Sequence, residues 1–66
     1  MNTKKIAAKL RELRGDKSME EVARAIGISK SAIAMYETGK RVPKDNVKKK
    51  LSEYYKCPVS DLFFAS

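Results

Sequence analysis

Apolar residues recur along the chain with helical spacing, and glycine or proline punctuates the pattern. Ile6, Leu10 and Leu13 lie at i, i+4 and i+7, on one face of a helix predicted over residues 4–14. The same reasoning predicts further helices over residues 19–26, 30–37, 45–55 and 59–64. No stretch alternates apolar and β-branched residues with polar ones as a strand would. The pattern therefore predicts an all-α fold of five helices.

The second and third predicted helices are joined by a very short turn. Ser18 with Glu21 three residues later is a capping box, which starts the second helix. Gly27 ends that helix, because glycine adopts the positive φ of a sharp turn without strain. Ser29 then caps the third helix, only two residues after the glycine.

Residues 18–38 together have the pattern of a helix-turn-helix unit. Ala23 is small where two helices must cross closely, Gly27 makes the turn, and Ile33 anchors the second helix. The remaining apolar positions of the unit are Val22, Ile26, Ile28 and Tyr36. Such a joint projects its second helix outward, with the N-terminus of that helix able to enter a major groove.

Charge indicates the class of partner. The 66 residues are expected to form one domain, over 1–66. They include 15 Lys and Arg against 8 Asp and Glu, which gives a net charge of +7. This field favours an anionic partner, with nucleic acid first and a membrane surface or an acidic protein second. There is no apolar run of membrane-spanning length and no signal-peptide pattern, so we expect a cytoplasmic chain without a membrane partner.

The sequence lacks the residues of most catalytic and metal sites. It has no His and a single cysteine, Cys57, which excludes an intramolecular disulfide, a zinc finger and a His-based catalytic site. No nucleophile–base set is visible, so we expect no enzyme activity, no cofactor, no metal and no small-molecule effector site.

Two stretches carry a family resemblance. Residues 18–43 resemble the core of the Xre/Cro family of phage-repressor-type regulators, and residues 55–63 resemble that family's last helix-turn. The resemblance implies a lambda-repressor-like domain of five helices. It also implies a sequence-specific regulator of transcription, a repressor in the first place, that binds operator DNA as a dimer with its third helix in the major groove. An antitoxin-like or accessory module that binds a protein partner remains the alternative.

The resemblance also assigns candidate DNA contacts. The family's main base-reading positions fall on the third helix, at Lys30, Ser31, Ala34 and Met35. Candidate contacts to the DNA backbone are Lys17, Ser18, Ser29, Lys40, Arg41 and Lys44. A lysine can donate to guanine O6 or N7, and a short side chain can meet a thymine methyl. Met19 departs from the family's usual glutamine and cannot donate, so we expect the family's phosphate contact at this position to be either lost or replaced, with Lys17 as the candidate replacement.

Three further expectations concern packing and assembly. The family pattern pairs Arg11 with Glu37, although Arg14 is an alternative partner. The charge run of residues 48–50 is expected to form a solvated face. Aromatic residues near the C-terminus exceed what a small core can bury, and the candidate dimer contacts are Tyr54, Phe63 and Phe64.

Overall fold

The computed structural model describes residues 3–63, which form five helices and no strand in that range. The helices are α1 (Thr3–Arg14), α2 (Met19–Ile26), α3 (Lys30–Glu37), α4 (Asp45–Tyr55) and α5 (Val59–Phe63). The prediction of an all-α fold with five helices is confirmed. The predicted bounds differ from these only at the start of α1 and the end of α5, each by one residue.

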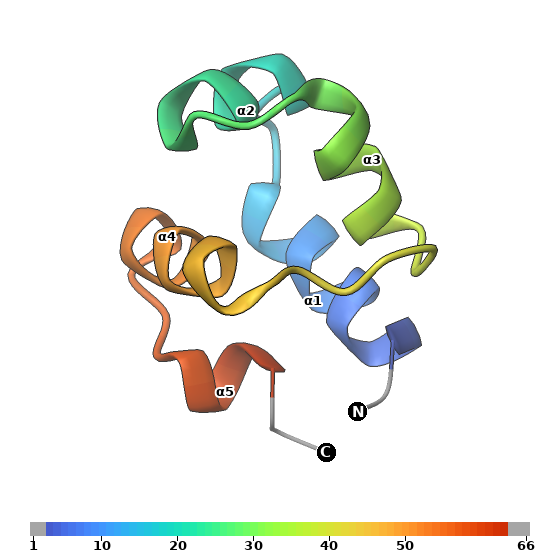
Figure 1. The fold of residues 1–66 in the computed structure, drawn as a ribbon, viewed down its shortest axis with the longest axis vertical. Coiled ribbons are helices and arrows are strands. Elements are labelled where there is room, and N and C mark those ends of the chain that lie inside the picture. The colour runs from blue at the N-terminus through green and yellow to red at the C-terminus, as the bar shows by residue number, and fades with distance from the viewer. Residues whose placement is uncertain (1–2, 64–66) are drawn as a thin grey trace.

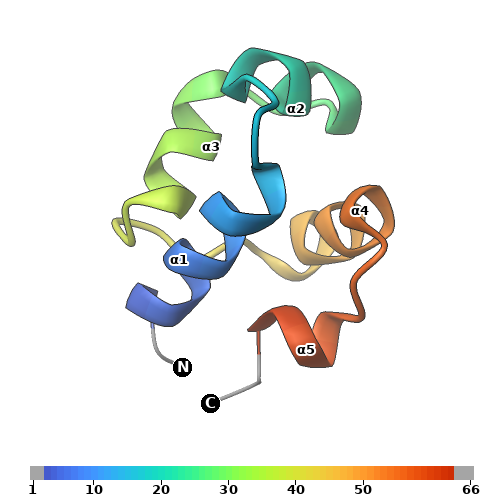
Figure 2. The same ribbon diagram turned by 180° about the vertical axis from the view of Figure 1, so that it is seen from behind.

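The helices surround one apolar core. In both Figure 1 and Figure 2, α1 lies between α3 and α5, whereas α2 contacts α4 directly. Every helix contributes buried side chains, and the core consists of Ile6, Leu10, Val22, Ala23, Ile26, Ile33, Tyr36, Val47, Leu51 and Leu62. The buried apolar positions of α2 and α3 are those that the helix-turn-helix pattern predicts.

The helix-turn-helix unit has the predicted caps at the starts of α2 and α3. Ser18 Oγ accepts a hydrogen bond from the Glu21 N–H, and Ser29 Oγ accepts one from the Ala32 N–H, both at 3.0 Å. Gly27 adopts a φ of 75°, and the N–H of Ile28 donates to the Ala23 carbonyl at 2.9 Å. These bonds satisfy the exposed ends of both helices and fix the direction in which α3 leaves the turn.

Two lysines, one within α4 and one directly after it, have an environment that the sequence pattern does not predict. Lys48 is only 8% exposed, so the expectation of a solvated face is wrong at this residue, whereas Lys49 and Lys50 are exposed. Lys48 follows the core residue Val47 directly, and its ammonium lies 3.9 Å from Asp45 Oδ1, three residues earlier on the same helix. Lys56 ends α4 with a φ of 55°, a left-handed conformation usually taken by glycine.

Candidate nucleic-acid interface

The helix α3 has a buried face and an open face. Ile33, Tyr36 and Glu37 face the core and are at most 9% exposed. The four predicted base-reading residues lie outside this buried set: Lys30 and Ser31 are exposed, and Ala34 and Met35 are half-buried. All four predicted base-reading positions thus lie on one helix, outside its buried set, and this helix runs along the edge of the molecule in Figure 1.

The N-terminal end of α3 carries an ion pair that the sequence did not suggest. Ser29 caps the helix, and Lys30 is its first residue. Lys30 Nζ lies 3.5 Å from Glu20 Oε1 in the first turn of α2. Glu20 is not among the predicted site residues, because its contact with Lys30 depends on the crossing of α2 and α3 and not on a sequence spacing.

The C-terminal end of α3 is held by two arginines of α1. Arg14 Nε donates to Glu37 Oε2 at 2.7 Å, and this hydrogen bond raises the pKa of Arg14. Arg11 donates instead to the main-chain carbonyl of Glu37. The expected side-chain pair of Arg11 with Glu37 is therefore replaced by the alternative pair with Arg14, while both arginines fasten α3 to α1.

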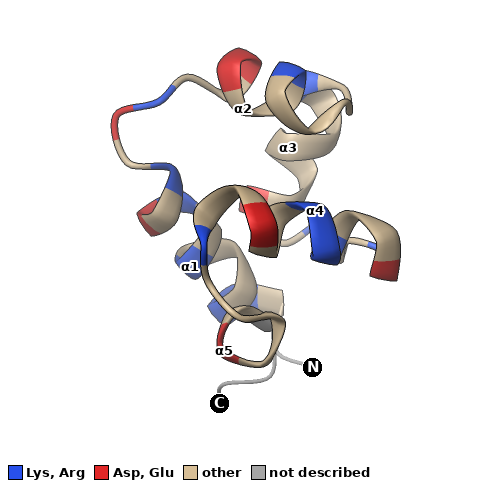
Figure 3. Cartoon of the chain, turned by 90° about the vertical axis from the view of Figure 1, so that its left-hand side faces the viewer, with Lys and Arg blue, Asp and Glu red and all other residues tan. Residues whose placement is uncertain are grey.

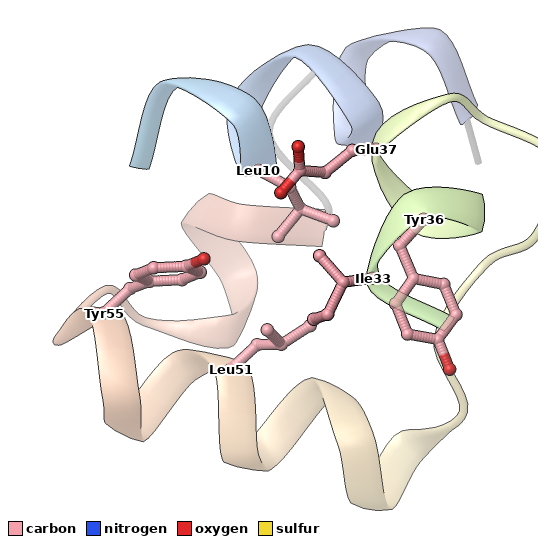
Figure 4. Close-up of a pocket in the computed structure, with 6 residues that line it drawn as sticks. All are labelled: Leu10, Ile33, Tyr36, Glu37, Leu51 and Tyr55. Carbon is pink, nitrogen blue, oxygen red and sulfur yellow. The ribbon is translucent and has the colours of Figure 1, made fainter. Parts of the chain in front are cut away.

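A small pocket lies beside this ion pair (Figure 4). It is lined by Leu10, Ile33, Tyr36, Glu37, Leu51 and Tyr55. Glu37 is 2% exposed, and its Oε1 atom has no hydrogen-bond partner among the described residues. Burial raises the pKa of Tyr55 to about 12, and the negative charge of Glu37 adds to this shift. The carboxylate therefore sits in apolar surroundings, with Arg14 as its compensating charge.

Basic residues follow α3 in the chain. Lys40 and Arg41 are exposed, and their main-chain N–H groups both donate to the Met35 carbonyl, at 3.0 and 3.3 Å. Lys44 is exposed at the N-cap of α4 and makes no side-chain capping bond there. This segment is tied to the end of α3 and presents three basic side chains to solvent.

The remaining predicted contacts lie on other elements. The Lys17 ammonium is 4.8 Å from the centroid of the Tyr54 ring, a cation–π contact, so a phosphate would compete with Tyr54 for Lys17. Tyr54 is half-buried and packs edge-on against Tyr55, with ring centroids 5.2 Å apart. Phe63 is the last residue of α5, and Phe64 lies outside the described residues.

Basic positions occur on several elements rather than on one helix. Figure 3 shows them on α1, on the connection between α1 and α2, and on α4. Within residues 3–63, no group of three or more His, Cys, Asp or Glu could hold a metal ion. No helix in the same range is long and apolar enough to cross a membrane.

Comparison with known proteins agrees with this geometry. The family model HTH_3, described as Helix-turn-helix, matches residues 8–62. The cryptic phage CTXphi transcriptional repressor RstR of Vibrio cholerae is 36% identical over 58 residues, which is 85% of this chain and 52% of the repressor. The chain thus spans about half the length of this curated relative. No solved structure gives a significant match.

Proposed function

The chain belongs to the helix-turn-helix family HTH_3, and we propose that it is a DNA-binding regulator of transcription that represses the genes beside its operator. Family membership and the likeness to a phage repressor point to a regulator without enzyme activity. Since the ligand would be chromosomal or phage DNA, the proposed place of action is the cytoplasm.

The open face of α3 is the observation that carries this proposal. Ile33, Tyr36 and Glu37 fix the inner face, so the outer face has a defined direction relative to the core. Lys30 and Ser31 lie in the first turn, the part of a recognition helix that reaches base edges deepest in the major groove. We propose that these two residues, with Ala34 and Met35 one turn later, read the bases.

Affinity in this proposal comes mainly from phosphates. Lys40, Arg41 and Lys44 follow the recognition helix and are exposed, as residues that meet the sugar–phosphate backbone must be. Ser18 and Ser29 belong to the same set through their positions at the starts of α2 and α3, whose main-chain N–H groups attract anions. Lys17 can contact a phosphate only if its ammonium gives up the cation–π contact with the Tyr54 ring.

Binding as a dimer follows from the small number of reading residues. Four side chains on one α3 select too few base pairs to specify one site in a genome, and a second copy doubles the readout. Two copies would place their recognition helices about 34 Å apart on a pseudo-palindromic site. The proposed contact between copies involves Tyr54, Phe63 and Phe64.

Selection of bound duplexes from a random DNA pool tests the function. We expect an inverted repeat to be enriched, and the logarithm of its binding constant to fall with the logarithm of salt concentration with a slope of about −5 to −9 for a dimer. A matched mobility-shift assay with competitor DNA gives the ratio of specific to random binding. A pool without an enriched sequence, together with a flat salt response, would contradict the proposal.

The apolar character of Ala34 and Met35 favours a second candidate function, the binding of a protein partner. Both are apolar and only half-buried, so α3 presents apolar surface outside its buried set, which also suits a protein partner. In an antitoxin-like or accessory module this face would bind protein and discriminate no DNA sequence. The same selection experiment separates the two functions.

A further inference from the structure

One ion pair joins the two helices of the helix-turn-helix unit. Glu20 Oε1 on α2 lies 3.5 Å from Lys30 Nζ on α3, and the two side chains are 65% and 62% exposed. The pair therefore lies on the surface at the end of α3 where the proposed base-reading residues begin. Nothing in the sequence pattern or the family match assigns a role to Glu20.

We propose that Glu20 is a positioning residue for DNA specificity: its carboxylate restricts the ammonium of Lys30 and so favours base contact over phosphate contact. The inference rests on the proposed DNA-binding function and deepens it. In this inference, an acidic residue at the edge of a basic interface weakens the binding of DNA that does not depend on sequence.

The position of Lys30 explains why it needs a partner. Lys30 is the first residue of α3, directly after the cap Ser29. The N-terminus of a helix carries a partial positive charge, which repels a cation there and drives a flexible lysine outward. The carboxylate of Glu20, on the neighbouring helix, offsets this repulsion and keeps the ammonium beside the first turn of α3.

The charge of Glu20 also acts on DNA directly. Phosphate contacts contribute affinity without sequence information, whereas base contacts discriminate. A carboxylate next to Lys30 repels phosphates and competes with them for the ammonium, so it weakens the arrangement in which Lys30 only meets the backbone. A guanine edge approached from the major groove carries acceptors without a full negative charge, and it suffers less of this repulsion.

Met19, which precedes Glu20 on α2, cannot restrain the ammonium of Lys30 in this way. Met19 is half-buried, packs against the core and has no hydrogen-bond donor. Glu20 is thus the polar side chain through which the first turn of α2 contacts the first residue of α3.

The test compares Glu20→Gln with Glu21→Gln on the full chain. Both residues are exposed in the first turn of α2, and both substitutions keep the side-chain volume and remove one negative charge. The readout is the affinity for the selected operator divided by the affinity for a random duplex, measured by fluorescence anisotropy. Circular dichroism checks that each variant is folded.

We expect both variants to bind random DNA more tightly, because each removes a charge that repels phosphate. Only Glu20→Gln should lower the specificity ratio, by about two- to five-fold, the range that an exposed ion pair can supply. In a Lys30→Met background the two variants should give equal ratios, since the partner of Glu20 is then absent.

Three results would overturn the inference. Equal ratios for Glu20→Gln and Glu21→Gln would show that only net charge matters. If Glu20→Gln still lowers the specificity ratio in the Lys30→Met background, Glu20 acts without Lys30. A wild-type chain that discriminates no DNA would remove the proposed function and this inference together, whereas the first two results leave the proposed function intact.

Discussion

Arg14→Met should destabilise the fold more than Arg11→Met, although both arginines contact Glu37. Arg14 Nε donates to Glu37 Oε2 at 2.7 Å, and the side chain of Glu37 is 3% exposed. Arg11 reaches only the main-chain carbonyl of the same residue. Loss of Arg14 therefore leaves a buried carboxylate without its compensating charge, whereas loss of Arg11 removes one hydrogen bond.

The size of the effect follows from burial. Removing one partner of a fully buried ion pair costs about 3–5 kcal/mol, because the other charge stays behind without compensation. The side chain of Arg14 is 20% exposed, so water can partly replace it and the expected loss is about 2–3 kcal/mol. Arg11→Met should cost about 1 kcal/mol, a typical net value for one hydrogen bond. In a domain this small, the larger loss corresponds to a decrease in Tm of about 8–24 °C.

Urea unfolding followed by far-UV circular dichroism measures these differences. The double variant Arg14→Met with Glu37→Gln provides the decisive control, since a neutral amide removes the stranded charge. We expect it to be more stable than Arg14→Met alone. The reasoning is refuted if Arg14→Met costs no more than Arg11→Met, or if Glu37→Gln gives no recovery in the Arg14→Met background.

The remaining predictions concern the turn, the half-buried Tyr55 and the DNA contacts. Gly27→Ala should lower the free energy of unfolding by about 1–2 kcal/mol, measured by thermal unfolding. The cause is the φ of 75° alone, because a Cβ there meets nothing within 4 Å. Ala23→Leu should lower the same free energy by about 1–3 kcal/mol through overpacking. The pKa of Tyr55 is raised from 10.0 to about 12, so its neutral form stabilises the fold below pH 10 and this contribution is lost as the pH rises through 12. Urea unfolding across this range should therefore show a smaller loss of stability for Tyr55→Phe than for the wild type. In binding assays, Lys30→Ala should cost about 1–3 kcal/mol on the operator and little on random DNA, whereas Lys40→Ala should weaken both alike.

Most of the fold can be predicted from local signals in the sequence. Ser18 and Ser29 are side chains that cap helices, and Gly27 is the residue that accepts a positive φ, so each marks a helix end without knowledge of the rest of the chain. The apolar spacing in α1 then decides which face is buried. These signals act over three or four residues, which is why the predicted and observed bounds nearly coincide.

The features that the sequence does not give are those decided by contacts between helices. Arg11 and Arg14 lie three residues apart on α1, and only the approach of α3 selects which of them meets the carboxylate of Glu37. The pair of Glu20 with Lys30 likewise depends on the angle at which α2 and α3 cross. Lysine at the left-handed end of α4, Lys56, has no local signal, since glycine is the usual residue there.

The candidate site depends on these same contacts, because α3 is too short to define its own direction. A helix of eight residues is unstable in isolation, so its position is set by what it packs against. Its N-terminal end is held by the cap of Ser29 and by the tight turn at Gly27, and its C-terminal end by the two arginines at Glu37. Both anchors lie at the ends of the helix or on its buried face, which leaves the outer face available for an approaching ligand. An exchange of the reading residues should therefore alter which DNA is bound without altering the fold, whereas a change at either anchor affects the direction of the whole reading face.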